Sequence, residues 1–383
     1  MWSVGETGFT VAIELFEVVA DQLRVGQGSP FTVRDEQGKL LLAAGSVISG
    51  ESQLSMLRQR ALYVEIDEQA VAGDDEPGRR RTVFERWQQA PKALDRLLAS
   101  LKQPGFVDRC DALADDLIAL VSRDPDIAIY HVVRQDSAQL IRYGLLHSLH
   151  CALLAQLAAT RAGWSALRTR RLVQAALTMN LGIVDVQGLY ARLGRLNSAQ
   201  RERIKAHPEV AFNKLREAGV DDAEWLQAVL QHHERTGGGG YPENIAQPAE
   251  MAQALRMIDI FVSKVSARAV RPAMPVHTAA KQLFASYPQH PLAAAIIKEF
   301  GIVPPGHFVQ LASGELAIVV RRGATAVTPL AAAVTDERGQ PVLSTQLRNT
   351  AEPGFALRST TPADKHLPHL QRVPAERLYG LVC

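Results

Sequence analysis

The chain has 383 residues, 47% of them hydrophobic, so it is long enough to bury a sizeable core and to form two or three domains. The 42 Lys and Arg residues nearly balance the 40 Asp and Glu residues, and the net charge of +2 gives no basis for expecting DNA or an acidic membrane as a partner. The three cysteines are widely spaced, which suits a reducing compartment. No segment reaches the roughly 18 consecutive apolar residues that span a bilayer, and no secretion signal begins the chain. We therefore expect a cytoplasmic protein without a membrane span.

Short apolar runs separated by turns predict a small α+β module in residues 1–70. Residues 30–34 and 39–43 are expected to form a hairpin, with its turn at residues 35–38. Residues 51–60 have the apolar spacing of a helix, and residues 61–66 are expected to form a further strand. Residues 71–82 are polar and rich in Gly, Asp and Arg, which is typical of a linker.

Residues 83–300 carry the spacing of successive helices. Residues 145–159 are apolar nearly all round, which is typical of a helix in the middle of a bundle. From residue 301 the pattern returns to strands with turns at residues 313–314, 322–323 and 337–339, so residues 301–383 are expected to form a β-rich segment. The predicted fold is mainly α, a helical bundle between a small N-terminal α+β module and a small C-terminal β-rich segment.

The stretch from Gln231 to Pro242, QHHERTGGGGYP, is the most informative in the chain. Its two adjacent histidines end a predicted helix, where the negative pole of the helix dipole favours a bound cation. The glycines that follow allow the backbone to approach a ligand closely. Taken alone, a His-His pair of this kind is more often a helix end before a surface loop, but the complete string is far more specific.

His232, His233, Glu234 and Arg235, followed by GxGYP, resemble the HHExxDGxGYP signature of the HD-GYP family, a bacterial branch of the HD phosphohydrolase superfamily. Other segments follow in the family's order across roughly residues 83–300, and this implies an HD-type helical bundle. The resemblance implies ligand contacts in the GYP loop by Gly238, Gly240 and Tyr241. It assigns metal ligands to His147 in the sequence HS, to His207 in IKAHP, and to Asp259 in RMIDIF.

The chain departs from the family where the HDxGK motif is expected, since it has Met179, Asn180, Leu181, Gly182 and Ile183 there. In the family this motif supplies a histidine ligand, an aspartate that bridges two metals, and a lysine that contacts phosphate. Methionine is a soft neutral donor, asparagine carries no charge, and isoleucine has no polar group. We therefore expect no intact catalytic set at these positions.

The surviving residues form a partial metal set. His207, His232 and His233 correspond to the ligands of one metal, and His147 and Asp259 are the remnants of the other site. Three histidines can hold one Fe, Mn or Zn ion, whereas a second metal is not expected. Asp185 is not expected to replace the lost carboxylate, because five helical residues turn its side chain by about 140° from the position of Asn180.

Arg268 and Arg271 follow the Asp259 segment roughly where the family has an Arg-Pro-Tyr motif that contacts phosphate, although Ala273 stands where the tyrosine is expected. Arginine suits phosphate because its planar fork binds two oxygens. A solvated helix face explains either arginine equally well.

Three functions remain open on the sequence alone. The first is a signalling protein that keeps the HD-GYP fold and binds cyclic di-GMP, a related nucleotide or a signalling protein without hydrolysing the nucleotide. The second is an active metal-dependent cyclic di-GMP phosphodiesterase with an incomplete site. The third is an interaction scaffold without metal or nucleotide. The chemistry favours the first, because loss of the bridging carboxylate dismantles a two-metal site.

Overall fold

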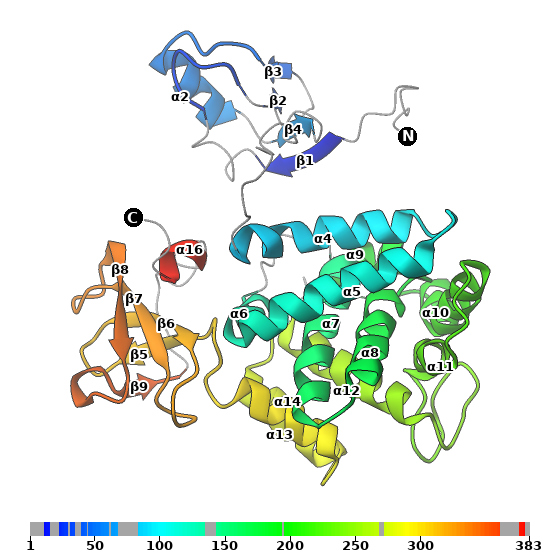
Figure 1. The fold of residues 1–383 in the computed structure, drawn as a ribbon. Coiled ribbons are helices and arrows are strands. Elements are labelled where there is room, and N and C mark those ends of the chain that lie inside the picture. Colours follow the sequence, from blue (N-terminus) through cyan, green and yellow to red (C-terminus); the bar gives the residue numbers. More distant parts are fainter. Residues whose placement is uncertain are drawn as a thin grey trace. The chain divides into compact units, whose positions relative to one another are not determined.

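The computed structural model describes residues 11–15, 23–29, 31–34, 40–43, 45–60, 63–67, 83–134, 143–193, 195–267, 272–360 and 375–379. The chain forms two compact units, residues 1–81 and 82–383, and each is described by itself (Figure 1). The predicted domain limits stay a prediction. The predicted linker, residues 71–82, lies outside the described residues.

The first unit contains a four-stranded antiparallel sheet in the order β1-β4-β2-β3 and one described helix. The elements are β1 (Val11–Leu15), β2 (Thr32–Arg34), β3 (Leu40–Leu42), α2 (Glu51–Arg60) and β4 (Tyr63–Asp67). Phe31, Val33 and Leu57 are among the buried residues of its small core. The hairpin strands and the helix match the expected positions, while β1 was not predicted and the expected turn at residues 35–38 lies outside the described residues.

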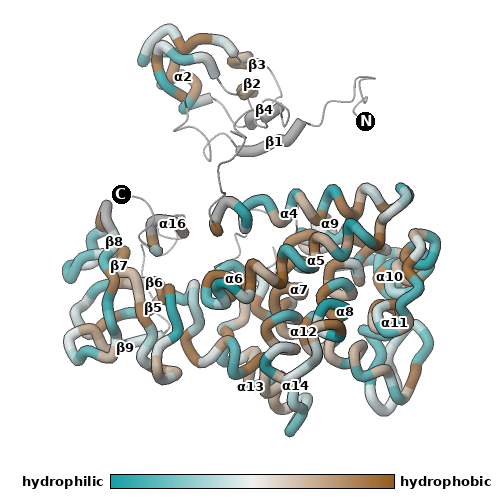
Figure 2. The backbone as a smooth tube through the Cα atoms, in the orientation of Figure 1, coloured by the Kyte–Doolittle hydropathy of each residue, from teal (hydrophilic) through white to brown (hydrophobic). Residues whose placement is uncertain are grey.

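The second unit is built around α7 (Tyr143–Arg161), which is buried from Tyr143 to Ala159 apart from Leu145 and Leu146. Apolar residues run along the helices of this bundle, as Figure 2 shows. The helices that precede and follow α7 along the chain are α4 (Val83–Ala99), α5 (Phe106–Arg123), α6 (Pro125–Val133), α8 (Ala166–Thr178), α9 (Val184–Arg192), α10 (Ser198–Glu217), α11 (Ala223–Gln231), α12 (Glu250–Val265), α13 (Val276–Ser286) and α14 (Pro291–Phe300). A helix with so little exposed surface can form only where other helices cover it, which places α7 at the centre.

Side-chain caps fix the starts of the helices that carry the site. Asn197 and Gln200 form a reciprocal capping box at the start of α10. Asp222 caps α11 by accepting a hydrogen bond from the backbone N–H of Trp225 at 3.0 Å. These caps set where α10 and α11 begin. They therefore help to fix the positions of His207 within α10 and of His232 and His233 just after α11.

The C-terminal part of the second unit is a five-stranded antiparallel sheet in the order β8-β7-β6-β5-β9. Its elements are β5 (Phe308–Leu311), β6 (Leu316–Arg321), β7 (Leu330–Thr335), β8 (Pro341–Asn349), the short 3-10 helix η4 (Pro353–Phe355) and β9 (Leu357–Ser359), followed by the short helix α16 (Ala375–Leu378). Strands β5 to β7 agree with the expected strands, whereas β8 and β9 were not predicted.

Ion pairs join this sheet to the helices. Arg322, just after β6, pairs with the carboxylates of Asp126 in α6 and Glu299 in α14. Arg321 Nη1 lies 2.7 Å from Asp124 Oδ1, at the start of α6. The predicted fold class, a mainly helical bundle flanked by small strand-containing segments at both ends, is confirmed. Among the described residues, no helix is both long and apolar enough to cross a membrane.

Candidate metal centre

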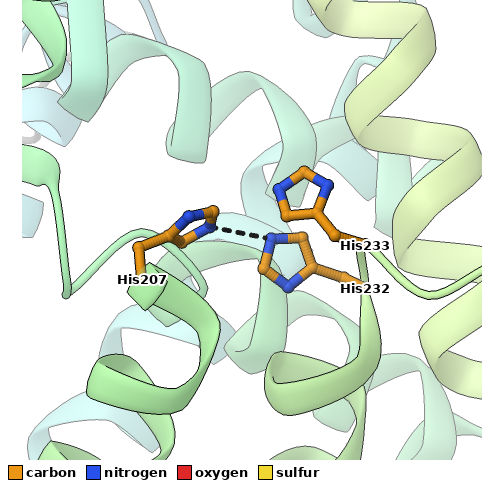
Figure 3. A group of neighbouring side chains, drawn as sticks. All are labelled: His207, His232 and His233. Atoms are coloured by element: carbon orange, nitrogen blue, oxygen red, sulfur yellow. Dashed lines mark hydrogen bonds between the residues drawn. The ribbon is translucent and has the colours of Figure 1, made fainter. Parts of the chain in front are cut away.

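Three imidazoles from two helices meet inside the bundle (Figure 3). His207 comes from α10, and His232 and His233 come directly after the last residue of α11. One ring nitrogen from each lies within 4.8 Å of the other two. The Nε2 atoms of His207 and His232 are 3.2 Å apart. Neighbouring nitrogens around a tetrahedral zinc ion with bonds of about 2.0–2.1 Å lie about 3.3 Å apart, so this pair already has the spacing of metal ligands.

Backbone carbonyls select the tautomers of two of these rings. His207 Nδ1 faces the carbonyl oxygen of Ile204, and His232 Nδ1 lies 2.7 Å from that of Val229. A carbonyl oxygen can only accept a hydrogen bond, so in the neutral ring the proton resides on Nδ1 and donates to it. Each Nε2 then presents a lone pair toward the other ring. A cation placed near both nitrogens would remove the repulsion between these lone pairs.

Burial keeps the three rings neutral. Burial, followed by repulsion from the neighbouring His232, lowers the pKa of His207 to about 3. Burial likewise lowers the pKa of His232 and holds the pKa of His233 well below its usual range. Metals bind the neutral imidazole, so the rings are in the ligating state at neutral pH. The residues fit one divalent transition metal, and that they bind one stays a prediction.

A second group of donors contains His147, Cys151 and Asp259. His147 and Cys151 lie on α7 and Asp259 lies on α12. His147 Nε2 is 2.8 Å from Asp259 Oδ1 and 3.6 Å from Cys151 Sγ. Burial opposes ionisation of Asp259, but the hydrogen bond from His147 and the charge interactions with His147, His233 and His232 together hold the pKa of this carboxyl well below its usual range. Burial raises the pKa of the Cys151 thiol.

The segment aligned with HDxGK contacts a residue beside one donor group and a member of the other. The Asn180 amide donates to Ser148 Oγ at 3.2 Å, and Ser148 directly follows His147. Gly182 packs against His207, since a Cβ at this position would lie 2.6 Å from the carbonyl oxygen of His207. Met179 and Ile183 are both buried. Asn180 therefore lies near the group of His147, and it offers a neutral amide there.

The GYP loop is fastened to the end of α11 by Glu234. This buried carboxylate accepts hydrogen bonds from the backbone N–H groups of Glu243 at 2.7 Å and Ile245 at 3.1 Å. A Cβ on Gly240 would lie 2.5 Å from the Cα of Glu234, so only glycine fits there. The ring of Tyr241 stacks on His233 with 4.6 Å between ring centroids. Gly238, with φ +91°, lies on the outer part of the loop.

Two predicted ligand contacts, Arg268 and Arg271, lie outside the described residues. Asp185 lies on the surface, where its carboxylate is 2.7 Å from Arg203, and it takes no part in either donor group. Sequence reasoning missed Cys151. Its position four residues after His147 in a helix was the available signal, because residues with that spacing share a helix face.

A pocket of about 500 Å³ borders the GYP loop and α12. Arg235, Arg256 and Lys264 bring three positive charges to its lining, and Tyr287 and His290 contribute rings. The carboxylate of Glu234, also in the lining, is engaged by the loop backbone. A pocket with this charge and size suits an anionic small molecule.

Comparisons with known proteins agree with this fold. The family model for the HD domain matches residues 129–290. The cyclic di-GMP phosphodiesterase PA4108 of Pseudomonas aeruginosa is 28% identical over 225 residues, which cover 57% of this chain and 53% of that protein. The chain thus spans about half the length of this curated relative. Bd1817, an HDG"Y"P protein from Bdellovibrio bacteriovorus, has a similar fold, with a TM-score of 0.52, 15% identity, and coverage of 76% of this chain and 99% of that chain.

A helical bundle that gathers histidines and an aspartate from α7, α10, α11 and α12, together with the family match, defines an HD-domain protein. The GYP loop after the paired histidines, the HD domain match over residues 129–290 and the likeness to PA4108 together support an HD-GYP family member.

Proposed function

We propose that this chain is a cytoplasmic signalling protein that binds cyclic di-GMP, or a related nucleotide, and hydrolyses it slowly or not at all. Its output would pass to a signalling protein partner. The observation that carries this proposal is Asn180, a neutral amide that hydrogen-bonds to Ser148 beside His147, where the family motif has an anionic metal ligand.

The loss of catalysis follows from the chemistry of the replaced pair. In two-metal hydrolysis a shared anionic ligand holds two cations at about 3.5–4 Å, where together they stabilise the attacking and leaving oxygens. Asn180 is neutral and already donates to Ser148. Met179 is fully buried in the helical core. Neither side chain can hold two hard cations together.

The three-histidine group fits one cation. His207, His232 and His233 would hold a single Fe, Mn or Zn ion through neutral nitrogens. A bound ion would supply Lewis acidity to a phosphate oxygen. Tyr241 stacks on His233, one of the three residues that would hold the ion. This arrangement supports binding of a phosphodiester more than its cleavage.

The pocket beside the site supports a nucleotide ligand. Arg235 and Arg256 are in its lining without an ion pair or side-chain hydrogen bond among the described residues, so their charges are available to phosphates. The relative from Pseudomonas aeruginosa is named for cyclic di-GMP, a ligand with two phosphates. We assign the same nucleotide class to this chain.

The test compares the natural chain with Met179→His/Asn180→Asp/Ile183→Lys, which restores the family motif. Calorimetry should find cyclic di-GMP binding to both proteins, and hydrolysis assays with Mn²⁺ or Fe²⁺ should find at least tenfold faster turnover in the restored variant. Adding His232→Ala to that variant should remove the gain.

Two outcomes would favour the other functions. Fast turnover by the natural chain that disappears on His232→Ala would identify an active phosphodiesterase. Absence of both nucleotide and metal binding in a folded protein would favour an interaction scaffold.

A further inference from the structure

We propose that His147, Cys151 and Asp259 form a second metal site, one that takes Zn²⁺ or another thiophilic divalent ion and uses the Cys151 thiolate as a ligand. The sequence led us to expect no second metal because only His147 and Asp259 were counted there. Cys151 adds a third donor to this group. The inference does not depend on nucleotide binding.

The three donors have a spacing that a tetrahedral ion can use. Cys151 follows His147 by four residues on α7, so both side chains lie on one face of the helix. Bonds of about 2.0 Å to nitrogen and 2.3 Å to sulfur put the two donors about 3.5 Å apart around zinc. The observed distance from His147 Nε2 to Cys151 Sγ is 3.6 Å.

Asp259 completes the group from a different helix. Its Oδ1 lies 2.8 Å from His147 Nε2, where it makes a hydrogen bond. A nitrogen and an oxygen around zinc are about 3.4 Å apart, so metal binding needs these two atoms to separate by only about half an ångström. Asp259 is the less buried of the three and has room for that shift.

Packing directs His147 toward this group. The ring lies stacked on Tyr143, with an angle of 13° between their planes. Its Nδ1 is buried and has no hydrogen-bond partner among the described residues. The polar contacts of the ring therefore go through Nε2, the atom that faces both Cys151 and Asp259.

The negative charges of the thiolate and carboxylate, and the softness of the sulfur ligand, favour a divalent metal such as zinc. A thiolate and a carboxylate together neutralise a divalent cation, which makes a filled site acceptable in this buried position. Binding sends the Cys151 thiol proton to solvent. The proton that His147 Nε2 donates to Asp259 moves to Nδ1, so that Nε2 presents a lone pair to the ion, and no atom changes its oxidation state. Thiolate ligands favour zinc over manganese and magnesium, so this group differs in preference from a carboxylate-bridged pair. The remaining position of the ion would be open to water or a ligand.

The other cysteines provide matched controls. Cys110 is also fully buried, but it lies in the core of the bundle on α5 and belongs to neither donor group of the described residues. Cys383 ends the chain. A Cys110→Ser/Cys383→Ser variant keeps Cys151 as its single cysteine, and Cys151→Ser keeps the other two.

The experiment uses the full chain, stripped of metal and titrated with Co²⁺, which reports thiolate ligation by charge-transfer absorption in the near ultraviolet. The natural chain and Cys110→Ser/Cys383→Ser should show this band, and Zn²⁺ should abolish it. Cys151→Ser should lose the band and bind one zinc ion fewer per chain, with circular dichroism confirming its fold.

X-ray absorption at the zinc edge of the natural protein provides a test that needs no variant, and a sulfur neighbour at about 2.3 Å is expected. Absence of both the cobalt band and the sulfur neighbour in the folded natural chain would overturn the proposal, as would a band that survives Cys151→Ser. Because no readout involves a nucleotide, a failure here is distinct from a failure of the proposed function.

Discussion

His207 and His232 approach each other through their Nε2 atoms, at 3.2 Å, while the Nδ1 atom of each ring faces a backbone carbonyl of its own helix. The carbonyls keep the protons on the far sides of the rings. The helix backbones of α10 and α11 thus hold two metal-ligating lone pairs toward each other before any metal arrives. Such preorganisation reduces the rearrangement that binding requires.

The first prediction concerns manganese, which avoids thiolates and therefore reports the three-histidine group. His233→Ala should weaken Mn²⁺ binding at least about 100-fold, because it removes a direct ligand where even an outer-shell change costs 10–100-fold. Asp259→Ala should weaken it much less, since Asp259 belongs to the other donor group. Calorimetry with Mn²⁺ measures both. Equal losses in the two variants would mean that the two groups act as one site.

The second prediction concerns Arg322, which joins the C-terminal sheet to α6 and α14. Arg322→Met should lower the free energy of unfolding by about 3 kcal/mol, because the carboxylates of Asp126 and Glu299 stay mostly buried and lose a partner. Arg321→Met is the control. Arg321 is 41% exposed, so its replacement should cost no more than about 1 kcal/mol. Urea unfolding measures the difference, and equal losses would contradict it.

The helical part of the fold could be predicted because its signals are local. Apolar spacing and capping residues such as Asn197 and Asp222 act within one helix, and both residues cap helices in the structure. The strands β1 and β9 were missed because their pairing depends on partners far along the chain, whereas β8 pairs with β7, the strand directly before it. Strand β8 begins with Pro341, a residue that weakens a strand prediction.

The residues of the donor groups likewise differ in whether local sequence signals could predict them. His232 and His233 are neighbours in a motif, so their proximity is evident, and the resemblance supplied His207. Cys151 sits in a helix that is apolar nearly all round, where a cysteine is expected to pack as a small apolar residue. Only the approach of α12 to α7 reveals that the thiol lies beside His147 and near Asp259.

The third prediction concerns the GYP loop. Gly240→Ala should destabilise the protein by about 3 kcal/mol and displace the loop, because the new Cβ would overlap the backbone of Glu234 and Arg235. Gly237→Ala is the matched control. Gly237 has φ +88° and open space around it, so it should cost only about 1–2 kcal/mol from its left-handed backbone. Thermal unfolding and nucleotide binding should both rank the variants in this order. A milder effect of Gly240→Ala would show that the loop backbone yields to the new methyl group.

The last prediction concerns stability in acid, which the structure links to His131 and His150. Burial lowers the pKa of His131 to about 4. Burial, followed by repulsion from His131 and His147, lowers the pKa of His150 to about 3. In the unfolded chain both rings titrate near the usual value of about 6.5. Between these values the unfolded chain binds protons that the folded chain excludes, so the free energy of unfolding falls as the pH falls.

Each of these rings should contribute up to about 1.4 kcal/mol per pH unit to that loss, beginning below about pH 6.5 and ending near its folded pKa. His131→Phe should therefore reduce the slope of stability against pH between about pH 6 and 5, because phenylalanine binds no proton and can still pack against Trp87, whose ring centroid is 5.2 Å away. Urea unfolding of the metal-free chain at several pH values measures the slope, with the region above about pH 7 as an internal control where natural chain and variant should run parallel. An unchanged slope in acid would mean that His131 takes up its proton in the folded protein, with water reaching the buried Nε2 that has no partner in the structure.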